Sequence, residues 1–223
     1  PRPSAAAARR AANAVPDSWR LHWRSDRQTP AWLQTQRSGA APMPAAKSLS
    51  VVAPRAPSAL ALDVLQAHTD IFGLQNPRDE LRHAETVRGE DGRLRVRFTR
   101  QVAGVEVWGE DLVVHLDAQG ELFAFNGAYS ATPSTAVPAA RIGAQQALRL
   151  TQQDLSQHQQ LQTLSATLGQ LLDYSGPTAE LRLQPGESGE LTPVWRVDIR
   201  PNLRDHWVYT VDGRTGEIME RYN

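Results

Sequence analysis

The stretch from Leu94 to Asn126 constrains the fold most, because its apolar and polar residues alternate with a period of two. Such alternation is typical of strands that bury one face and expose the other. Gly104 and Gly109 interrupt the alternation, and Asp117 to Gly120 has the composition of a tight turn in which glycine supplies a positive φ. The stretch therefore predicts three or four short antiparallel strands.

The first of these strands divides its residues between two faces. Its apolar face is formed by Leu94, Val96 and Phe98. We assign four arginines to its charged face, namely Arg93, Arg95, Arg97 and Arg100. A row of arginines on a strand is either a solvated surface, which is the commoner case, or a surface that docks an acidic patch on a partner.

An aromatic residue extends this candidate surface. Trp108 lies close in sequence to Glu106 and Glu110, and tryptophan is enriched at protein interfaces. The candidate partner interface therefore comprises Arg95, Arg97 and Trp108.

The same stretch carries a set of residues at fixed spacing, namely Phe98, Gln101, Gly104, Val105, Val107, Gly109, Asp111, Leu112, Val114, Asp117 and Gly120. This set resembles the propeptide domain of the fungalysins and thermolysins, which is part of the pro-region of secreted zinc metallopeptidases. The alternative is a generic meander in which the glycines serve only the turns.

A helix is expected from Ser58 to Phe72, with Ser58 as its N-cap and Gly73 as its C-terminal stop. Residues 74–81 are expected to form a loop or short turn. A helix followed by this loop also resembles the propeptide family, in which the helix packs on the sheet.

The N-terminal part, residues 1–57, reads as an extension of the main fold. A strand is expected near residues 18–24, where Trp19, Leu21 and Trp23 alternate with polar residues. Residues 37–57 are rich in proline and alanine and form a connector, with a candidate short strand at 49–52.

A second helical and stranded region follows the prolines of residues 130–138. A helix is expected over 138–151, a second one along the leucine repeat of 161–171, and four strands after residue 179. This part resembles a PepSY domain at Leu181, Trp195, Val197, Val211, Asp212, Thr215, Gly216 and Ile218. Gly213 departs from that family, which usually has alanine there.

The composition excludes several classes of function. The 24 basic and 24 acidic residues give a net charge of zero, which argues against nucleic acid or an anionic membrane as the main partner. Cysteine is absent, so the chain has no disulfide framework. None of the six histidines has zinc-ligand spacing and no H-E-x-x-H occurs, so no catalytic residue, metal ligand or cofactor is assigned to the chain.

The expected fold is α+β, with two small domains that each pack a helix on an antiparallel sheet. These are a propeptide domain at 58–133 and a cystatin-like PepSY domain at 138–223, after the extension at 1–57. By resemblance, the chain is the pro-region of a thermolysin-like peptidase, bacterial and secreted or periplasmic. It would act as intramolecular chaperone and inhibitor until autocleavage removes it, and the partner's catalytic domain would hold the zinc. The alternative is a free-standing secreted binding module or an inhibitor acting in trans.

The last residues are the remaining candidate site. In the family the catalytic domain follows a PepSY domain after a short linker, and the peptidase cuts the junction itself. Arg221, Tyr222 and Asn223 are therefore a candidate processing site or cleft-facing segment, and the alternative is that cleavage occurs further on.

Overall fold

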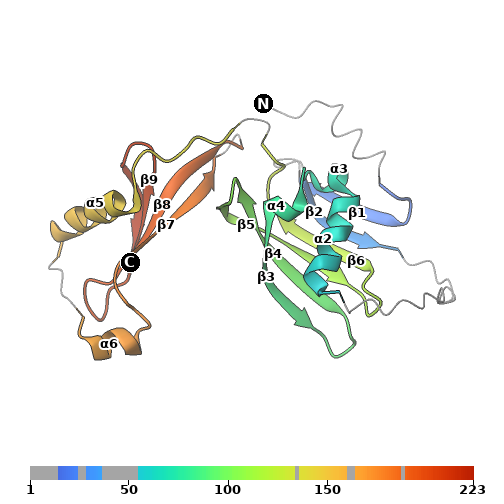
Figure 1. The fold of residues 1–223 in the computed structure, drawn as a ribbon, viewed down its shortest axis with the longest axis horizontal. Coiled ribbons are helices and arrows are strands. Elements are labelled where there is room, and N and C mark those ends of the chain that lie inside the picture. The colour runs from blue at the N-terminus through green and yellow to red at the C-terminus, as the bar shows by residue number, and fades with distance from the viewer. Residues whose placement is uncertain (1–14, 25–28, 37–54, 134–135, 160–163, 187–188) are drawn as a thin grey trace. The chain divides into compact units, whose positions relative to one another are not determined.

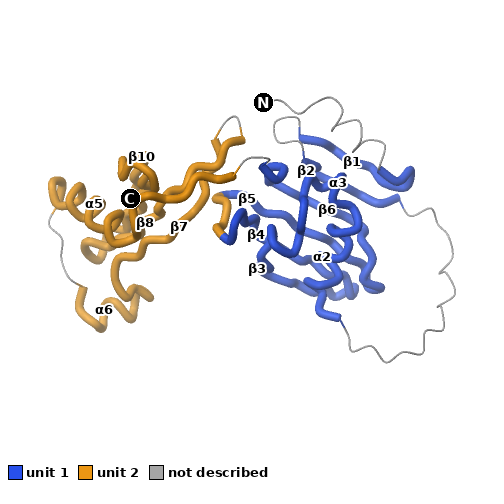
Figure 2. Tube along the Cα trace, turned by 45° about the horizontal axis from the view of Figure 1, so that its top comes forward, with its two compact units in different colours: residues 1–104, 109–134 blue, residues 105–108, 135–223 orange. Residues whose placement is uncertain are grey.

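The computed structural model describes residues 15–24, 29–36, 55–133, 136–159, 164–186 and 189–223 (Figure 1). The fold is α+β, as expected, with a few helices packed on mostly antiparallel sheets. The described residues divide into two compact units, the first within 1–104 and 109–134 and the second within 105–108 and 135–223 (Figure 2). This division does not test the two family resemblances on which the predicted domains were based.

The first unit is built on a sheet of six strands. In spatial order these are β1 (Trp19–Arg24), β2 (Thr29–Thr35), β6 (Leu122–Ala128), β5 (Val105–Leu116), β4 (Leu94–Val102) and β3 (Leu81–Arg88). The strand expected near 18–24 is confirmed as β1, and its neighbour β2 pairs with β6. Gly109 does not end a strand as expected, because β5 continues through it with a φ of 70°.

Three helices cover one side of this sheet: α2 (Pro57–Ala67), α3 (Thr69–Phe72) and α4 (Pro77–Glu80) (Figure 1). The prediction of a single helix over 58–72 is wrong in one respect, because His68 adopts a φ of −133° and interrupts the helix. Ser58 is not the N-cap either. Ala56 takes that position and Pro57 is the first helical residue, where its missing N–H costs nothing. Gly73 ends α3 in the left-handed conformation, as predicted.

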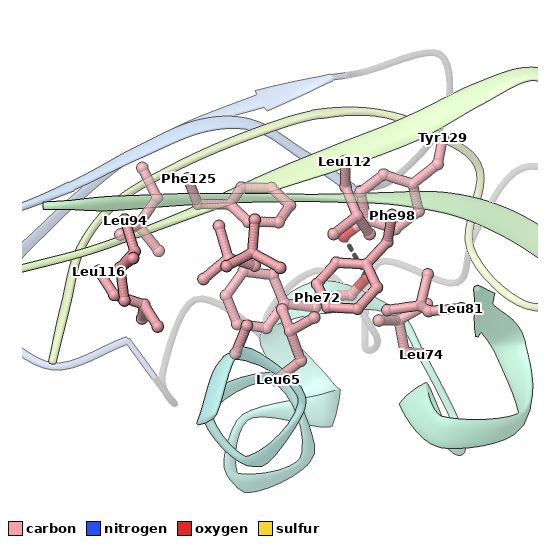
Figure 3. Close-up of a cluster of buried hydrophobic side chains, with 14 residues drawn as sticks. Leu65, Phe72, Leu74, Leu81, Leu94, Phe98, Leu112, Leu116, Phe125 and Tyr129 are labelled. Carbon is pink, nitrogen blue, oxygen red and sulfur yellow. Dashed lines mark hydrogen bonds between the residues drawn. The ribbon is translucent and has the colours of Figure 1, made fainter. Parts of the chain in front are cut away.

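The core of the first unit lies between the helices and the sheet (Figure 3). Phe72 packs on Phe125 with 4.8 Å between the ring centroids, and the Tyr129 hydroxyl donates a 2.7 Å hydrogen bond to the Phe72 carbonyl. Phe98 and Val114 are fully buried here, so the predicted apolar faces of β4 and β5 are confirmed.

The second unit contains the other strands. Val107 in the first residues of β5 pairs in parallel with β7. Antiparallel pairs then connect β7 (Thr178–Pro185), β8 (Leu191–Ile199), β9 (Trp207–Asp212) and β10 (Ile218–Tyr222). The core of this unit combines α5 (Ala144–Ser156) with the sheet, through Ala147, Leu155, Val197, Tyr209 and Val211.

Both helices expected in the second unit differ from their prediction. The first starts at Ala144 rather than 138, because the backbone N–H groups of Arg141 and Ile142 donate to the Gly213 carbonyl and hold this segment extended. The second is only α6 (Ala166–Leu171), and Leu171 at its end is 79% exposed. Leu161 and the candidate strand at 49–52 lie outside the described residues.

Candidate partner interface

Within the first unit, the described helices all lie on one side of the sheet, and none of them lies on the opposite side. On β4, Arg95 and Arg97 point to this side because Val96 and Phe98 point into the core. We call this side the uncovered face, and its residues include Arg20, Trp32, Arg95, Arg97, Val113 and Asn126.

The strand register aligns the residues of the uncovered face in rows. One row crosses four strands and contains Val113, Asn126, Trp32 and His22. The next contains His115, Ala124, Gln34 and Arg20. The centre of the face is therefore formed by small or uncharged side chains, and charged side chains flank it.

Arg97 is held in place by its neighbour on β5. Its Nε and Nη2 atoms lie 2.9 and 2.6 Å from Oδ2 of Asp111. Glu110, the adjacent residue, points into the core side and accepts hydrogen bonds from the backbone and hydroxyl of Ser130. Glu110 and Asp111 therefore lie on opposite sides of the sheet.

His115 is half-buried on the uncovered face. Its Nε2 lies 2.9 Å from Oδ1 of Asn126, and its ring contacts the Phe123 ring at 5.7 Å between centroids. Desolvation lowers the pKa of His115, and the positive charge of Arg95 lowers it further, against the opposing hydrogen bond from Asn126.

Arg100 does not belong to the charged face, contrary to expectation. Its position has the parity of Phe98, so its side chain enters the core, where it is 1% exposed. There it forms an ion pair with Glu80 at 2.6 Å and donates to the Thr132 hydroxyl at 3.1 Å. Arg93, Arg95 and Arg97 are two residues apart and share one face, whereas Arg100 is three residues after Arg97 and falls on the other face. This spacing was the signal in the sequence that could have predicted the burial of Arg100.

Trp108 is part of the second unit. The Arg196 guanidinium lies over its ring at 5.9 Å, and Glu106, two residues earlier, forms an ion pair with Arg182. Trp108 is half-buried by these neighbours. The candidate interface predicted from the sequence is thus divided between two units, with Arg95 and Arg97 in the first and Trp108 in the second.

The last strand is anchored to the second unit at two points. Arg221 forms an ion pair with Asp154 on α5, and the Tyr209 hydroxyl donates a 3.0 Å hydrogen bond to the same carboxylate. Burial and Asp154 together raise the pKa of Tyr209 to about 12. Asn223 accepts from the His206 backbone at 3.0 Å and donates to Asp205 at 2.6 Å. Between the two anchors, Tyr222 is 46% exposed.

A cleft of about 780 Å³ lies beside α6 in the second unit. Its polar lining includes Gln152, Asp173 and Arg200, and the Arg200 backbone N–H donates to the Tyr174 hydroxyl at 3.1 Å. The described lining contains neither histidine nor cysteine. In the described part of the chain, no group of three or more metal-binding side chains is close enough to hold an ion.

Comparison with known proteins agrees with part of the sequence interpretation. Residues 79–129 match the family model of the Fungalysin/Thermolysin Propeptide Motif. No curated protein matches the chain. Among solved structures, the Bacillus megaterium YpeB C-terminal domain is 13% identical over 99% of this chain and 97% of that one, with a TM-score of 0.37, and no conclusion rests on it. The segment from the end of α4 to the residue after β6 is therefore similar to the propeptide motif of fungalysin and thermolysin, which confirms the resemblance recognised in its sequence.

Proposed function

We propose that this chain is the pro-region of a thermolysin-like zinc metallopeptidase, which it helps to fold and keeps inactive until the peptidase cleaves it off. The observation that carries the proposal is the propeptide motif at 79–129. Its residues form β3 to β6 and supply Val96, Phe98, Val114 and Phe125 to the core of the first unit. The matched motif is thus the structural centre of a folded unit.

The proposed partner is the catalytic domain of the peptidase, which supplies the zinc and the catalytic residues. A tether between the two raises their effective concentration, so that even a moderate interface blocks the active-site cleft efficiently. An extended segment would occupy such a cleft most simply through strand-type backbone hydrogen bonds. The peptidases that carry this motif are exported, so we place this chain outside the cytoplasm, secreted or periplasmic. None of the described helices has the length and apolar character needed to cross a membrane.

Arg221, Tyr222 and Asn223 are the proposed segment at or near the cleft. The side chains of Arg221 and Asn223 are both occupied by contacts within the second unit. In this proposal Tyr222 is therefore the side chain offered to the cleft, and the two anchored residues fix the point from which the chain extends toward the partner.

Refolding of the partner tests the proposal. Denatured thermolysin is diluted into buffer with and without the folded chain, and the recovered activity is assayed after the chain is removed by limited proteolysis. The proposal predicts a higher yield with the chain than with an equal mass of albumin. The chain alone, with and without added zinc, should cleave no casein. Equal yields in both refolding reactions, or zinc-dependent casein cleavage that co-purifies with the chain, would contradict the proposal.

A further inference from the structure

We propose that the uncovered face of the first sheet is the surface that binds the catalytic domain, and that it recognises an acidic patch there. This inference rests on the proposed function and adds the surface and its chemistry. It concerns the face that carries Arg95 and Arg97, and it assigns no role to the cleft of the second unit.

The uncovered face carries a net positive charge. By register and alternation it carries the arginines at 20, 82, 95 and 97 and the acids Glu85 and Asp111, an excess of two positive charges, to which Arg93 and its ion-pair partner Asp91 add none. The whole chain has a net charge of zero. The positive charge is therefore concentrated on this face, and a surface of opposite sign is the complementary partner.

The shape and size of the uncovered face suit a protein partner. Small residues occupy the centre of the face at Val113, Ala124 and Ala128, while Trp32 beside them is 37% exposed. Six strands spaced about 4.8 Å apart and six residues long span roughly 600 Å². A standard interface takes about 800 Å² from each partner. The face would therefore supply about three quarters of one side of a standard interface, and residues at its rim would have to supply the rest.

Two cations of this face, Arg97 and Arg93, are held in position before a partner arrives. Asp111 orients Arg97, and Asp91 and the Phe123 ring orient Arg93, with 3.3 Å between Nε and Oδ2 and 4.8 Å to the ring centroid. Ordered side chains lose less entropy on binding. Arg95 lies exposed on this face and forms no ion pair with any described residue. Its guanidinium is the group that would pair with a partner's carboxylate.

A nucleic acid is the less suitable occupant. A protein that binds nucleic acid through phosphates can make about 6–10 phosphate contacts, and an excess of two charges around an uncharged centre does not supply that number. A folded protein surface with a few carboxylates matches both the charge and the exposed Trp32.

The test uses the full chain and mature thermolysin as the probe, with Kd measured by titration calorimetry at low and high salt. Arg95→Glu should weaken binding about tenfold or more and reduce its salt dependence, because a repulsive charge replaces an attractive one. Arg95→Lys, which keeps the charge, should stay within about threefold of the wild type. The matched control is Arg149→Glu on the exposed side of α5, which should change Kd less than about twofold.

The outcomes separate this inference from the proposed function. Wild-type chain that binds thermolysin while Arg95→Glu binds equally well would overturn the inference and leave the proposed function standing. If the wild-type chain does not bind thermolysin, both the inference and the proposed function are contradicted. The melting temperature of Arg95→Glu should equal that of the wild type, and a clear loss of stability in the isolated chain would show that the chain's own residues occupy the face, which also overturns the inference.

Discussion

Arg100 on β4 forms a buried ion pair with Glu80 at the end of α4, with 2.6 Å between Nη1 and Oε2. The second carboxylate oxygen of Glu80 accepts the backbone N–H groups of Gln75 and Asn76. The Thr132 hydroxyl, from the segment that follows β6, also donates to Glu80. The pair therefore connects the helical layer, the sheet and the segment that leaves the first unit.

Removing one partner of this pair should be strongly destabilising. Arg100→Met leaves the Glu80 carboxylate buried without its counter-charge, which typically costs about 3–5 kcal/mol. The double variant Arg100→Met with Glu80→Leu should cost clearly less than the sum of the single variants, because it leaves no buried charge unpaired. Urea unfolding of the four proteins measures both effects. A cost of under about 1 kcal/mol for Arg100→Met would contradict the account of the pair.

The ion pair of Arg100 and Glu80 also makes the stability of the fold depend on pH. Desolvation acts to raise the pKa of Glu80, but hydrogen bonds from Thr132 and from the backbone, together with the charge of Arg100, lower it below 4.5 overall. A lowered folded-state pKa means that the contribution is complete above the unfolded pKa and is lost as the pH falls through the folded one. The urea midpoint should therefore fall as the pH drops below about 5 and through the lowered pKa of Glu80. The fall should be smaller in Glu80→Gln, and an identical fall in both proteins would assign it to other carboxylates.

Truncating a side chain on the buried face of β4 should cost much more stability than truncating one on the uncovered face. Phe98→Ala removes a fully buried ring and should cost about 3–5 kcal/mol, and Val114→Ala on β5 should cost somewhat less. Arg95→Ala, on the uncovered face, should cost less than about 0.5 kcal/mol. Denaturant melts of the three variants test the face assignment, which is wrong if Arg95→Ala and Phe98→Ala destabilise equally.

The strands of both units could be predicted because alternation records directly which side chains a half-buried sheet must hide. Arg100 was misplaced because an arginine in a row of arginines looks solvated, and only Glu80, 20 residues away in sequence, shows why it is buried. The break at His68 and the late start of α5 had no local signal. The start of α5 depends on backbone hydrogen bonds to Gly213, which belongs to a turn some 70 residues later.

Gly213 itself lies against residues that are distant in sequence, and a substitution can test how closely they pack. A Cβ at this position would lie 2.7 Å from the Pro193 carbonyl oxygen and 3.3 Å from the Ala140 side chain. Gly213→Ala, the residue usual in the PepSY family, should therefore cost about 1–3 kcal/mol through overpacking. Gly143→Ser is the control, since a Cβ there meets open space and serine is a good N-cap for α5. Thermal melts that show both variants at wild-type stability would mean that the segment 140–142 yields without cost.

The most direct test of the account is inhibition of a mature thermolysin-like peptidase by the folded chain. Hydrolysis of a peptide substrate by thermolysin is followed while wild-type chain is titrated from well below to well above the enzyme concentration. The account predicts saturable inhibition that approaches one chain per enzyme and weakens as substrate concentration rises, because the chain and the substrate compete for one cleft. Full activity in a molar excess of chain that is folded by circular dichroism would contradict the claim that this chain is a peptidase pro-region.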